Sequence, residues 1–216
     1  TNRMIGTGGR ADPLGLGVVG RSVVICTYSS GVEGGPNDIQ RPNREVLHRG
    51  AKFNYERVSV RYDGRMVTRE VVRHPGAVVV LPLLATPQGA KVVLIRNWRI
   101  SIERWLYELP AGTLEAGEDP AACAARELEE ETGFSAATIA PLCRFYSSPG
   151  LSDELMWAYL AMGLAPVGQR LEGGELITVH PTPARGALAM ISSGELFDAK
   201  SILTLLLAEG RGLLGA

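Results

Sequence analysis

From about Glu45 onward, apolar and polar residues alternate along the chain. The segment EVLHRGAKFNYERVSVRYDGRMVTREVVRH carries this alternation on both sides of the pair Asp63-Gly64. A period of two is typical of half-buried strands, and an Asp-Gly pair between two such runs favours a tight hairpin turn. The pattern therefore predicts an N-terminal antiparallel hairpin region.

Apolar runs further along the chain predict additional strands. AVVVLPLLA and AKVVLIRNW are separated by TPQG, which has the composition of a turn. CRFYSS and ELMWAYLAM flank the loop PGLSD, and ELITVH follows as another short strand. These runs provide enough strands for a central sheet.

Two segments carry helix signals. Asp119 is a suitable N-cap, Pro120 suits the first turn, and Gly133 ends the pattern. Asp198 can cap a final helix that ends at Gly210, the one short helix expected after residue 180. Strands and helices in mixed order, with hairpins, predict an α/β (α+β) fold, a sandwich of helices around a mixed β-sheet.

Composition divides the chain into two parts. Residues 1–44 are rich in Gly, Pro, Ser and Asn, which predicts a flexible N-terminal extension to which we assign no role. Residues 45–216 are expected to form one domain, because a chain of 216 residues suits a single domain with an appendage.

Charge and cysteine content narrow the classes of partner. The formal net charge is −1, so no basic excess points to nucleic acid or to an anionic membrane as a partner. No apolar run reaches the roughly 18 residues that a membrane span needs. Cys26, Cys123 and Cys143 are widely separated and form no CxxC pair, which favours a reducing compartment. We therefore expect a cytoplasmic protein.

The stretch RELEEETG, residues 126–133, concentrates negative charge within the first predicted helix. At about 100° per residue, Glu127, Glu130 and Glu131 share one arc of the helix, whereas Glu129 points to the opposite side. Leu128 lies in a third sector that can pack on a sheet. Clustered carboxylates suit Mg²⁺, although a solvated acidic helix face remains the alternative from charge pattern alone.

The residues around this helix complete a longer pattern. Its members, in order, are Gly112, Glu118, Arg126, Glu127, Leu128, Glu130, Glu131, Gly133 and Phe134. The spacing resembles the Nudix box, Gly-x5-Glu-x7-Arg-Glu-U-x-Glu-Glu-x-Gly-U with U apolar, and every defined position is filled. The resemblance implies a Nudix α/β/α sandwich and an enzyme that hydrolyses a nucleoside diphosphate linked to another group.

The resemblance also implies roles for the box residues. Glu127 and Glu131 would bind Mg²⁺, with Mn²⁺ as the alternative ion, and Glu130 would be a further ligand or hold water at the metal. The backbone carbonyl of Ala111 would complete the metal shell. The remaining box residues are expected to shape the site: Arg126 to orient a neighbouring carboxylate, Glu118 to support the junction of loop and helix, and Gly112 to allow a tight loop.

Flanking segments over residues 45–210 resemble the ADP-ribose pyrophosphatase branch of this family. They are REVVRHPGAVVVLPL, ELPAGTLEAGE, SSPGLSDE and DAKS, and Pro149 follows Phe134 by fifteen residues as in that branch. The branch implies that Arg99 binds substrate phosphate and that Glu115 faces the ribose side or water at the metal. It also implies that the loop PGLSDE presents Glu154, with Asp153 as the less favoured choice, toward the attacked phosphorus.

The branch further implies a homodimer in which Arg69 and Glu70 reach substrate across the interface. The expected reaction is hydrolysis of ADP-ribose to AMP and ribose 5-phosphate. The alternatives are another nucleoside diphosphate sugar, such as GDP-mannose, or a dinucleotide polyphosphate as substrate. A non-catalytic ADP-ribose sensor is less favoured, because the box is intact.

Overall fold

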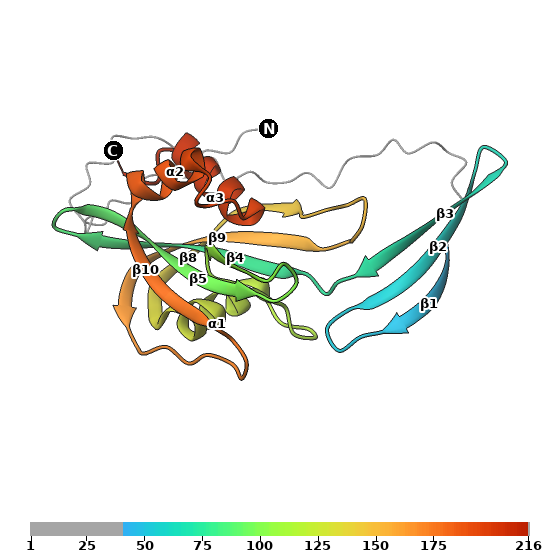
Figure 1. Ribbon diagram of the computed structural model, residues 1–216, viewed down its shortest axis with the longest axis horizontal. Coiled ribbons are helices and arrows are strands. Elements are labelled where there is room, and N and C mark those ends of the chain that lie inside the picture. The colour runs from blue at the N-terminus through green and yellow to red at the C-terminus, as the bar shows by residue number, and fades with distance from the viewer. Residues whose placement is uncertain (1–40, 216) are drawn as a thin grey trace, which may run out of the picture.

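Two separate β-sheets organise the chain in the computed structural model, which describes residues 41–215 (Figure 1). Residues 1–40 of the predicted extension lie outside this range. A small sheet projects from one end of a larger body in which a second sheet is covered by helices. The two sheets are described in turn, because each carries predicted site residues.

The projecting sheet is antiparallel and contains three strands. They are β1 (Asn43–Arg49), β2 (Asn54–Tyr62) and β3 (Arg65–Arg73), in the order β1-β2-β3. Tyr62 pairs with Arg65 across the turn, and both turn residues have positive φ angles, 48° at Asp63 and 69° at Gly64. Positive φ at both central positions is what a two-residue hairpin turn requires, so the predicted hairpin is confirmed.

The larger sheet has seven strands and is mixed. The strands are β4 (Ala77–Thr86), β5 (Gly89–Arg99), β6 (Arg104–Glu108), β7 (Ala111–Thr113), β8 (Phe134–Tyr146), β9 (Leu155–Pro166) and β10 (Ile177–Pro183). Their order is β10-β5-β4-β9-β8, with β6 paired to β5 and β7 paired to β4. The β4–β9 pair is parallel and the other pairs are antiparallel.

Three helices cover the two faces of this sheet. Helix α1 (Pro120–Thr132) lies on one face, and α2 (Ala184–Ser193) and α3 (Ala199–Gly210) lie on the other (Figure 1). This arrangement confirms the predicted α/β/α sandwich. None of the helices within residues 41–215 is long and apolar enough to cross a membrane.

Alternation along β4 feeds both layers of the core. Val78 and Val80 pack with Leu128 of α1, whereas Val79 and Leu81 belong to the cluster that packs against α2 and α3. All five side chains are fully buried. Burying about 25 cal/mol per Å² of apolar surface makes these two layers the main source of stability, and they hold α1 rigidly beneath β4.

Helix α1 begins and ends as the sequence predicts. The side chain of Asp119 accepts hydrogen bonds from the backbone N–H groups of Ala121 and Ala122, and Pro120 occupies the first turn. Gly133 ends the helix in the left-handed region with φ of 73°. The length and phase of the acidic helix are therefore fixed by its own sequence.

The expectation of one helix after residue 180 is wrong, because α2 precedes α3. Its N-cap position, Pro183, makes no side-chain hydrogen bond, so the usual start signal is missing. Packing of Ala184 and Ala187 against the sheet stabilises the helix instead. Asp198 caps α3 as predicted, by accepting from the backbone N–H of Ser201.

Candidate active site

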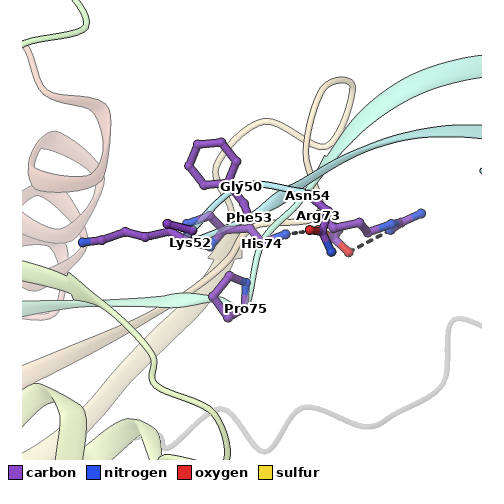
Figure 2. A pocket seen from close by; sticks show the side chains of 9 residues that line it. Gly50, Lys52, Phe53, Asn54, Arg73, His74 and Pro75 are labelled. Atoms are coloured by element: carbon purple, nitrogen blue, oxygen red, sulfur yellow. Dashed lines mark hydrogen bonds and ion pairs between the residues drawn. The ribbon is translucent and has the colours of Figure 1, made fainter. Parts of the chain in front are cut away.

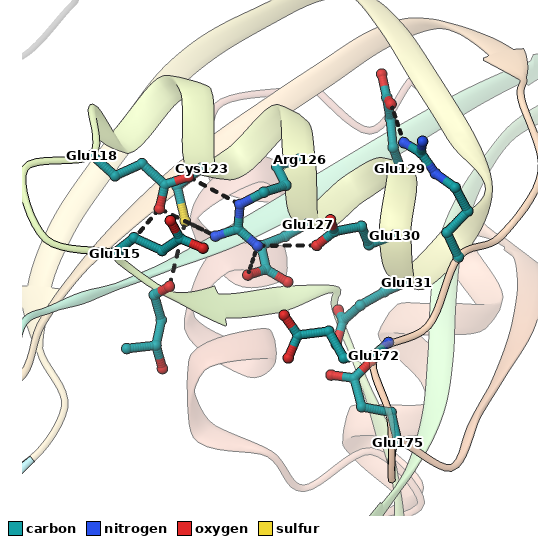
Figure 3. A network of polar contacts seen from close by, with 12 residues as sticks. Glu115, Glu118, Cys123, Arg126, Glu127, Glu129, Glu130, Glu131, Glu172 and Glu175 are labelled. Atoms are coloured by element: carbon teal, nitrogen blue, oxygen red, sulfur yellow. Dashed lines mark hydrogen bonds and ion pairs between the residues drawn. The ribbon is translucent and has the colours of Figure 1, made fainter. Parts of the chain in front are cut away.

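Arg126 lies at the centre of a network of carboxylates on α1 (Figure 3). Its Nε and Nη2 atoms donate to the two carboxylate oxygens of Glu118, at 2.9 and 3.1 Å. Its Nη1 atom donates to Oε1 of Glu127 at 2.7 Å and to Oε2 of Glu130 at 3.0 Å. The guanidinium therefore binds three carboxylates at once, which extends the predicted orienting role of Arg126. Its hydrogen bonds hold the pKa of Glu118 down at about 2.

Glu131 is the most deeply buried of the helix carboxylates, with 3% of its surface exposed. Its Oε2 atom accepts a hydrogen bond of 2.8 Å from the backbone N–H of Ala111, at the start of β7. Burial raises the pKa of Glu131 to about 8, and the same cause raises the pKa of Glu127. Two carboxylates whose charge is disfavoured by burial thus lie side by side, which is the electrostatic signature of a candidate site.

Gly112 in β7 has a different role from the one that the sequence predicts. It lies in a strand and is not among the residues with positive φ, so a tight loop does not explain it. A Cβ built on Gly112 would overlap the carboxylate of Glu127. Only glycine leaves room for Glu127 to lie against the strand.

A loop before β10 adds two carboxylates that sequence reasoning missed, Glu172 and Glu175. The negative charge of Glu175 contributes to the raised pKa of both Glu127 and Glu131. Figure 3 shows the two loop glutamates next to Glu131, on the side away from Arg126. Their only signal in the sequence is the turn EGGE, in which the backbone N–H of Glu172 donates to Oε2 of Glu175 at 3.0 Å.

Hydrogen bonds to the C-terminal end of α1 hold this loop in place. The backbone N–H of Val167 donates to the carbonyl of Gly133 at 2.8 Å, and that of Arg170 donates to the carbonyl of Glu130 at 3.0 Å. The guanidinium of Arg170 also pairs with Glu129 at 3.2 Å, on the side of α1 opposite to the other glutamates. The prediction that Glu129 points away from the cluster is confirmed.

Arg99, at the end of β5, is fixed by a buried carboxylate. Its Nε and Nη2 atoms bind the two oxygens of Glu108 at 2.8 and 2.6 Å, and Glu108 is fully buried. Lys200 of α3 also binds Glu108, at 2.6 Å, and Asp198 at 2.9 Å. Arg99 is close enough to Glu131 for their charges to interact, so the structure brings the predicted phosphate ligand to the carboxylate cluster. Sequence reasoning missed Glu108 and Lys200.

The loop that carries Asp153 and Glu154 lies at the junction between the two sheets. Both oxygens of Asp153 are engaged, one by Arg73 at 2.8 Å and the other by the backbone N–H of His74 at 2.9 Å. A carboxylate of Glu154 lies 3.6 Å from Nε2 of His74. Asp153 therefore anchors the loop, and Glu154 is the carboxylate that the loop leaves available.

The other predicted substrate residues lie at the edges of the site or far from it. Glu115 donates its backbone N–H to Glu118 at 2.9 Å, next to the Arg126 network. Arg69 and Glu70 lie on β3 in the projecting sheet, where Glu70 accepts from the hydroxyl of Tyr55 at 2.5 Å. No hydrogen bond or ion pair among the described residues joins Arg69 or Glu70 to α1 of the same chain.

The chemistry of the donor set fits a divalent cation. The available atoms are carboxylate oxygens, which are hard ligands of the kind that Mg²⁺ and Mn²⁺ prefer, and burial already disfavours their uncompensated charge. Within residues 41–215, no three acidic, histidine or cysteine side chains converge closely enough to enclose an ion. Nη1 of Arg126 lies between Glu127 and Glu130 in this arrangement.

Comparison with known proteins shows where this arrangement recurs. The sequence matches the NUDIX domain over residues 73–184, more than half of the chain. An ADP-ribose pyrophosphatase of Bacillus subtilis (strain 168) is 40% identical over 141 residues, which cover 64% of this chain and 75% of that protein. A methanol dehydrogenase activator of Bacillus methanolicus is 37% identical over 143 residues, covering 65% and 76%.

A solved structure shares the fold. The crystal structure of an ADP compounds hydrolase superposes with a TM-score of 0.68 at 22% identity, covering 81% of this chain and 97% of that chain. The length of the domain match and the share of each relative that is covered lead to one conclusion. The chain belongs to the Nudix hydrolase family.

Proposed function

We propose that this protein hydrolyses the pyrophosphate bond of ADP-ribose to AMP and ribose 5-phosphate, with Mg²⁺ as cofactor. The observation that carries the proposal is the pair of buried carboxylates, Glu127 and Glu131, held on α1 against β7 and beside Arg99. A relative that is 40% identical and is named an ADP-ribose pyrophosphatase supports the choice of substrate.

Four groups would hold the metal. They are the carboxylates of Glu127, Glu130 and Glu131 and the backbone carbonyl of Ala111. When bound there, a divalent ion neutralises phosphate charge and acts as a Lewis acid. Mg²⁺ suits an all-oxygen donor set, and Mn²⁺ is the alternative ion.

The chain's own residues would perform the remaining tasks. Arg99 keeps its planar guanidinium fixed on Glu108 and would bind a phosphate of the substrate from its exposed side. Water attacks one phosphorus, a new oxygen–phosphorus bond forms, the bridging oxygen–phosphorus bond breaks, and a carboxylate takes the proton from the water. Both Glu154 and Glu175 lie on loops suited to this task, and the influence of Glu175 on Glu127 and Glu131 favours Glu175.

The projecting sheet supports the proposal of a homodimer. It exposes several large apolar side chains that a single chain leaves uncovered, namely Val46, Phe53, Tyr55, Tyr62 and Met66. A second copy that covers this sheet would also bring Arg69 and Glu70 near the partner's site. The free thiols of Cys123 and Cys143 fit a reducing compartment, so we propose the cytoplasm as the location.

A panel of substrates tests the reaction. The purified protein is incubated with Mg²⁺ and with ADP-ribose, GDP-mannose or a diadenosine polyphosphate, and the products are separated by chromatography. We expect AMP and ribose 5-phosphate to form fastest. Faster turnover of another compound would replace ADP-ribose as the substrate, and no turnover of any of them would favour a sensor.

Paired variants test the residues. Glu131→Gln is expected to lower kcat by roughly 100- to 1,000-fold, because the preorganised electrostatics of the site supply most of the catalysis. Glu129→Gln, on the far side of the same helix, is the matched control and should keep full activity. Comparing Glu175→Gln with Glu154→Gln identifies the proton acceptor, since its loss should lower kcat more than it raises KM.

A further inference from the structure

His74 follows β3 at the junction between the two sheets, where it faces the loop that carries Glu154. The pocket at this junction is lined by residues 50–54 and 73–75 and by Asp153, and Figure 2 shows His74 between Phe53 and Pro75. We propose that His74 is a positioning residue that holds the carboxylate of Glu154 in the active site. The proposal rests on the proposed function in one respect, the assignment of Glu154 to that site.

The hydrogen bonds of the ring determine which nitrogen carries the proton. The backbone N–H of Gly76 donates to Nδ1 of His74 at 3.1 Å. A backbone N–H can only donate, so Nδ1 must accept and carries no proton. The proton of the ring therefore lies on Nε2, the nitrogen that faces Glu154.

The contact between the ring and Glu154 is direct. Nε2 of His74 lies 3.6 Å from Oε1 of Glu154. A bridging water would hold the two atoms about 5 Å apart, so none fits between them. The N–H group at Nε2 thus points its positive end at a carboxylate, and no other partner of the Glu154 side chain is found among the described residues.

The ring itself has little freedom to move. It stacks on Phe53 with a centroid distance of 6.2 Å and an interplanar angle of 27°, and only 12% of the His74 side chain is exposed. Its backbone N–H is bound by Asp153 at 2.9 Å. A donor that is fixed from three directions can fix its acceptor in turn.

The backbone of the Glu154 loop is anchored to the same short segment. Val72 forms a parallel bridge with Ser152, and its N–H donates to the carbonyl of Leu151 at 2.9 Å. The N–H of Glu154 binds Oγ of Ser152 at 3.0 Å. Residues 72–74 therefore set both the path of the loop and the direction of its last carboxylate.

Two substitutions at position 74 separate the two ring nitrogens. His74→Asn keeps an acceptor near the place of Nδ1 and loses the donor to Glu154, whereas His74→Gln keeps a donor near the place of Nε2. Both side chains fit, because the ring borders an open pocket. Comparing them distinguishes the contact with Glu154 from the structural bond to Gly76.

Kinetics with ADP-ribose and Mg²⁺ give the first readout. Glu154→Gln identifies which of kcat and KM depends on Glu154. We expect His74→Asn to change the same parameter by about tenfold, His74→Gln to stay within about threefold of wild type, and the double variant His74→Asn/Glu154→Gln to match Glu154→Gln alone. Losses that multiply in the double variant, an equal loss in His74→Gln, or an unchanged Glu154→Gln enzyme would each overturn the proposal.

Nitrogen NMR gives a second readout that does not need turnover. The chain has three histidines, so the ring signals of His74 are assigned by their absence in His74→Asn. We expect an unprotonated Nδ1, a protonated Nε2, and a shift of the Nε2 signal in Glu154→Gln. An Nε2 signal that ignores Glu154→Gln refutes the contact even in an active enzyme. If the contact is seen but ADP-ribose is not hydrolysed, only the proposed substrate fails.

Discussion

The carboxylate of Glu127 occupies the space in which a side chain at position 112 would lie. We expect Gly112→Ala to push Glu127 out of its place against β7 while the buried core of α1 keeps the helix folded. Displacing a reacting group by about 1 Å costs roughly 100-fold in rate, so kcat for ADP-ribose should fall by at least about that factor. Steady-state kinetics, together with circular dichroism to check folding, measure this effect.

Gly210→Ala is the control for this substitution. Gly210 ends α3, has open space around it, and is not among the residues with positive φ. We expect unchanged activity and an unfolding free energy within about 1 kcal/mol of wild type. Equal activity of Gly112→Ala and Gly210→Ala would show that the position of Glu127 does not matter for turnover.

The ion pair between Glu118 and Arg126 should stabilise the fold in a pH-dependent way. Hydrogen bonds from Arg126 lower the pKa of Glu118 from 4.5 to about 2 in the folded state. A depressed carboxyl pKa contributes stability that is complete above the unfolded pKa and disappears as the pH falls through the folded pKa. The difference in unfolding free energy between wild type and Glu118→Gln should therefore be constant at pH 6–8 and shrink from about pH 4.5 toward pH 2.

Urea denaturation of both proteins at several pH values measures that difference. Subtracting the variant removes the acid sensitivity that the two proteins share. A difference that stays constant down to about pH 2.5 would contradict the assignment of the bond to the ionised carboxyl group.

Lys200 should matter both for stability and for Arg99. It is the second cation on the buried carboxylate of Glu108, at 2.6 Å. Lys200→Met leaves Arg99 as its sole charged partner, and we expect a loss of about 2 kcal/mol of unfolding free energy, less than the ~3–5 kcal/mol for a buried charge with no partner. KM for ADP-ribose should rise more than kcat falls, because Arg99 is drawn more tightly to Glu108.

Lys91→Met on β5 is the comparison for Lys200→Met. A substitution at an ordinary surface position changes stability by about 0.5 kcal/mol or less. Thermal melts and substrate titrations of both variants separate the effect on the fold from the effect on Arg99. A Lys200→Met protein that melts and binds like Lys91→Met would remove Lys200 from the support of Arg99.

The sequence predicts α1 well because the signals for α1 are local. Asp119, Pro120 and Gly133 mark its ends within the helix itself, and helical periodicity places three glutamates on one side. The hairpin at Asp63 and Gly64 is equally local. Features of this kind need no knowledge of what packs against them.

The remaining features depend on contacts between distant segments. Glu175 joins the site only because residues 167–170 bind the end of α1, and the burial of Glu108 arises from partners on β5 and α3. Helix α2 is an intermediate case. Ala184, Ala187 and Ile191 follow a helical period, but the absence of a cap concealed its start.

Burial of Glu131 sets the needs of the reaction against the needs of the fold. Because burial raises its pKa from 4.5 to about 8, Glu131 destabilises the folded chain increasingly as the pH rises through that interval. A neutral isostere would fold more favourably at neutral pH and would be of no use to a phosphate ester. The helix that defines the family is therefore a place where selection for maximal stability would erase the activity.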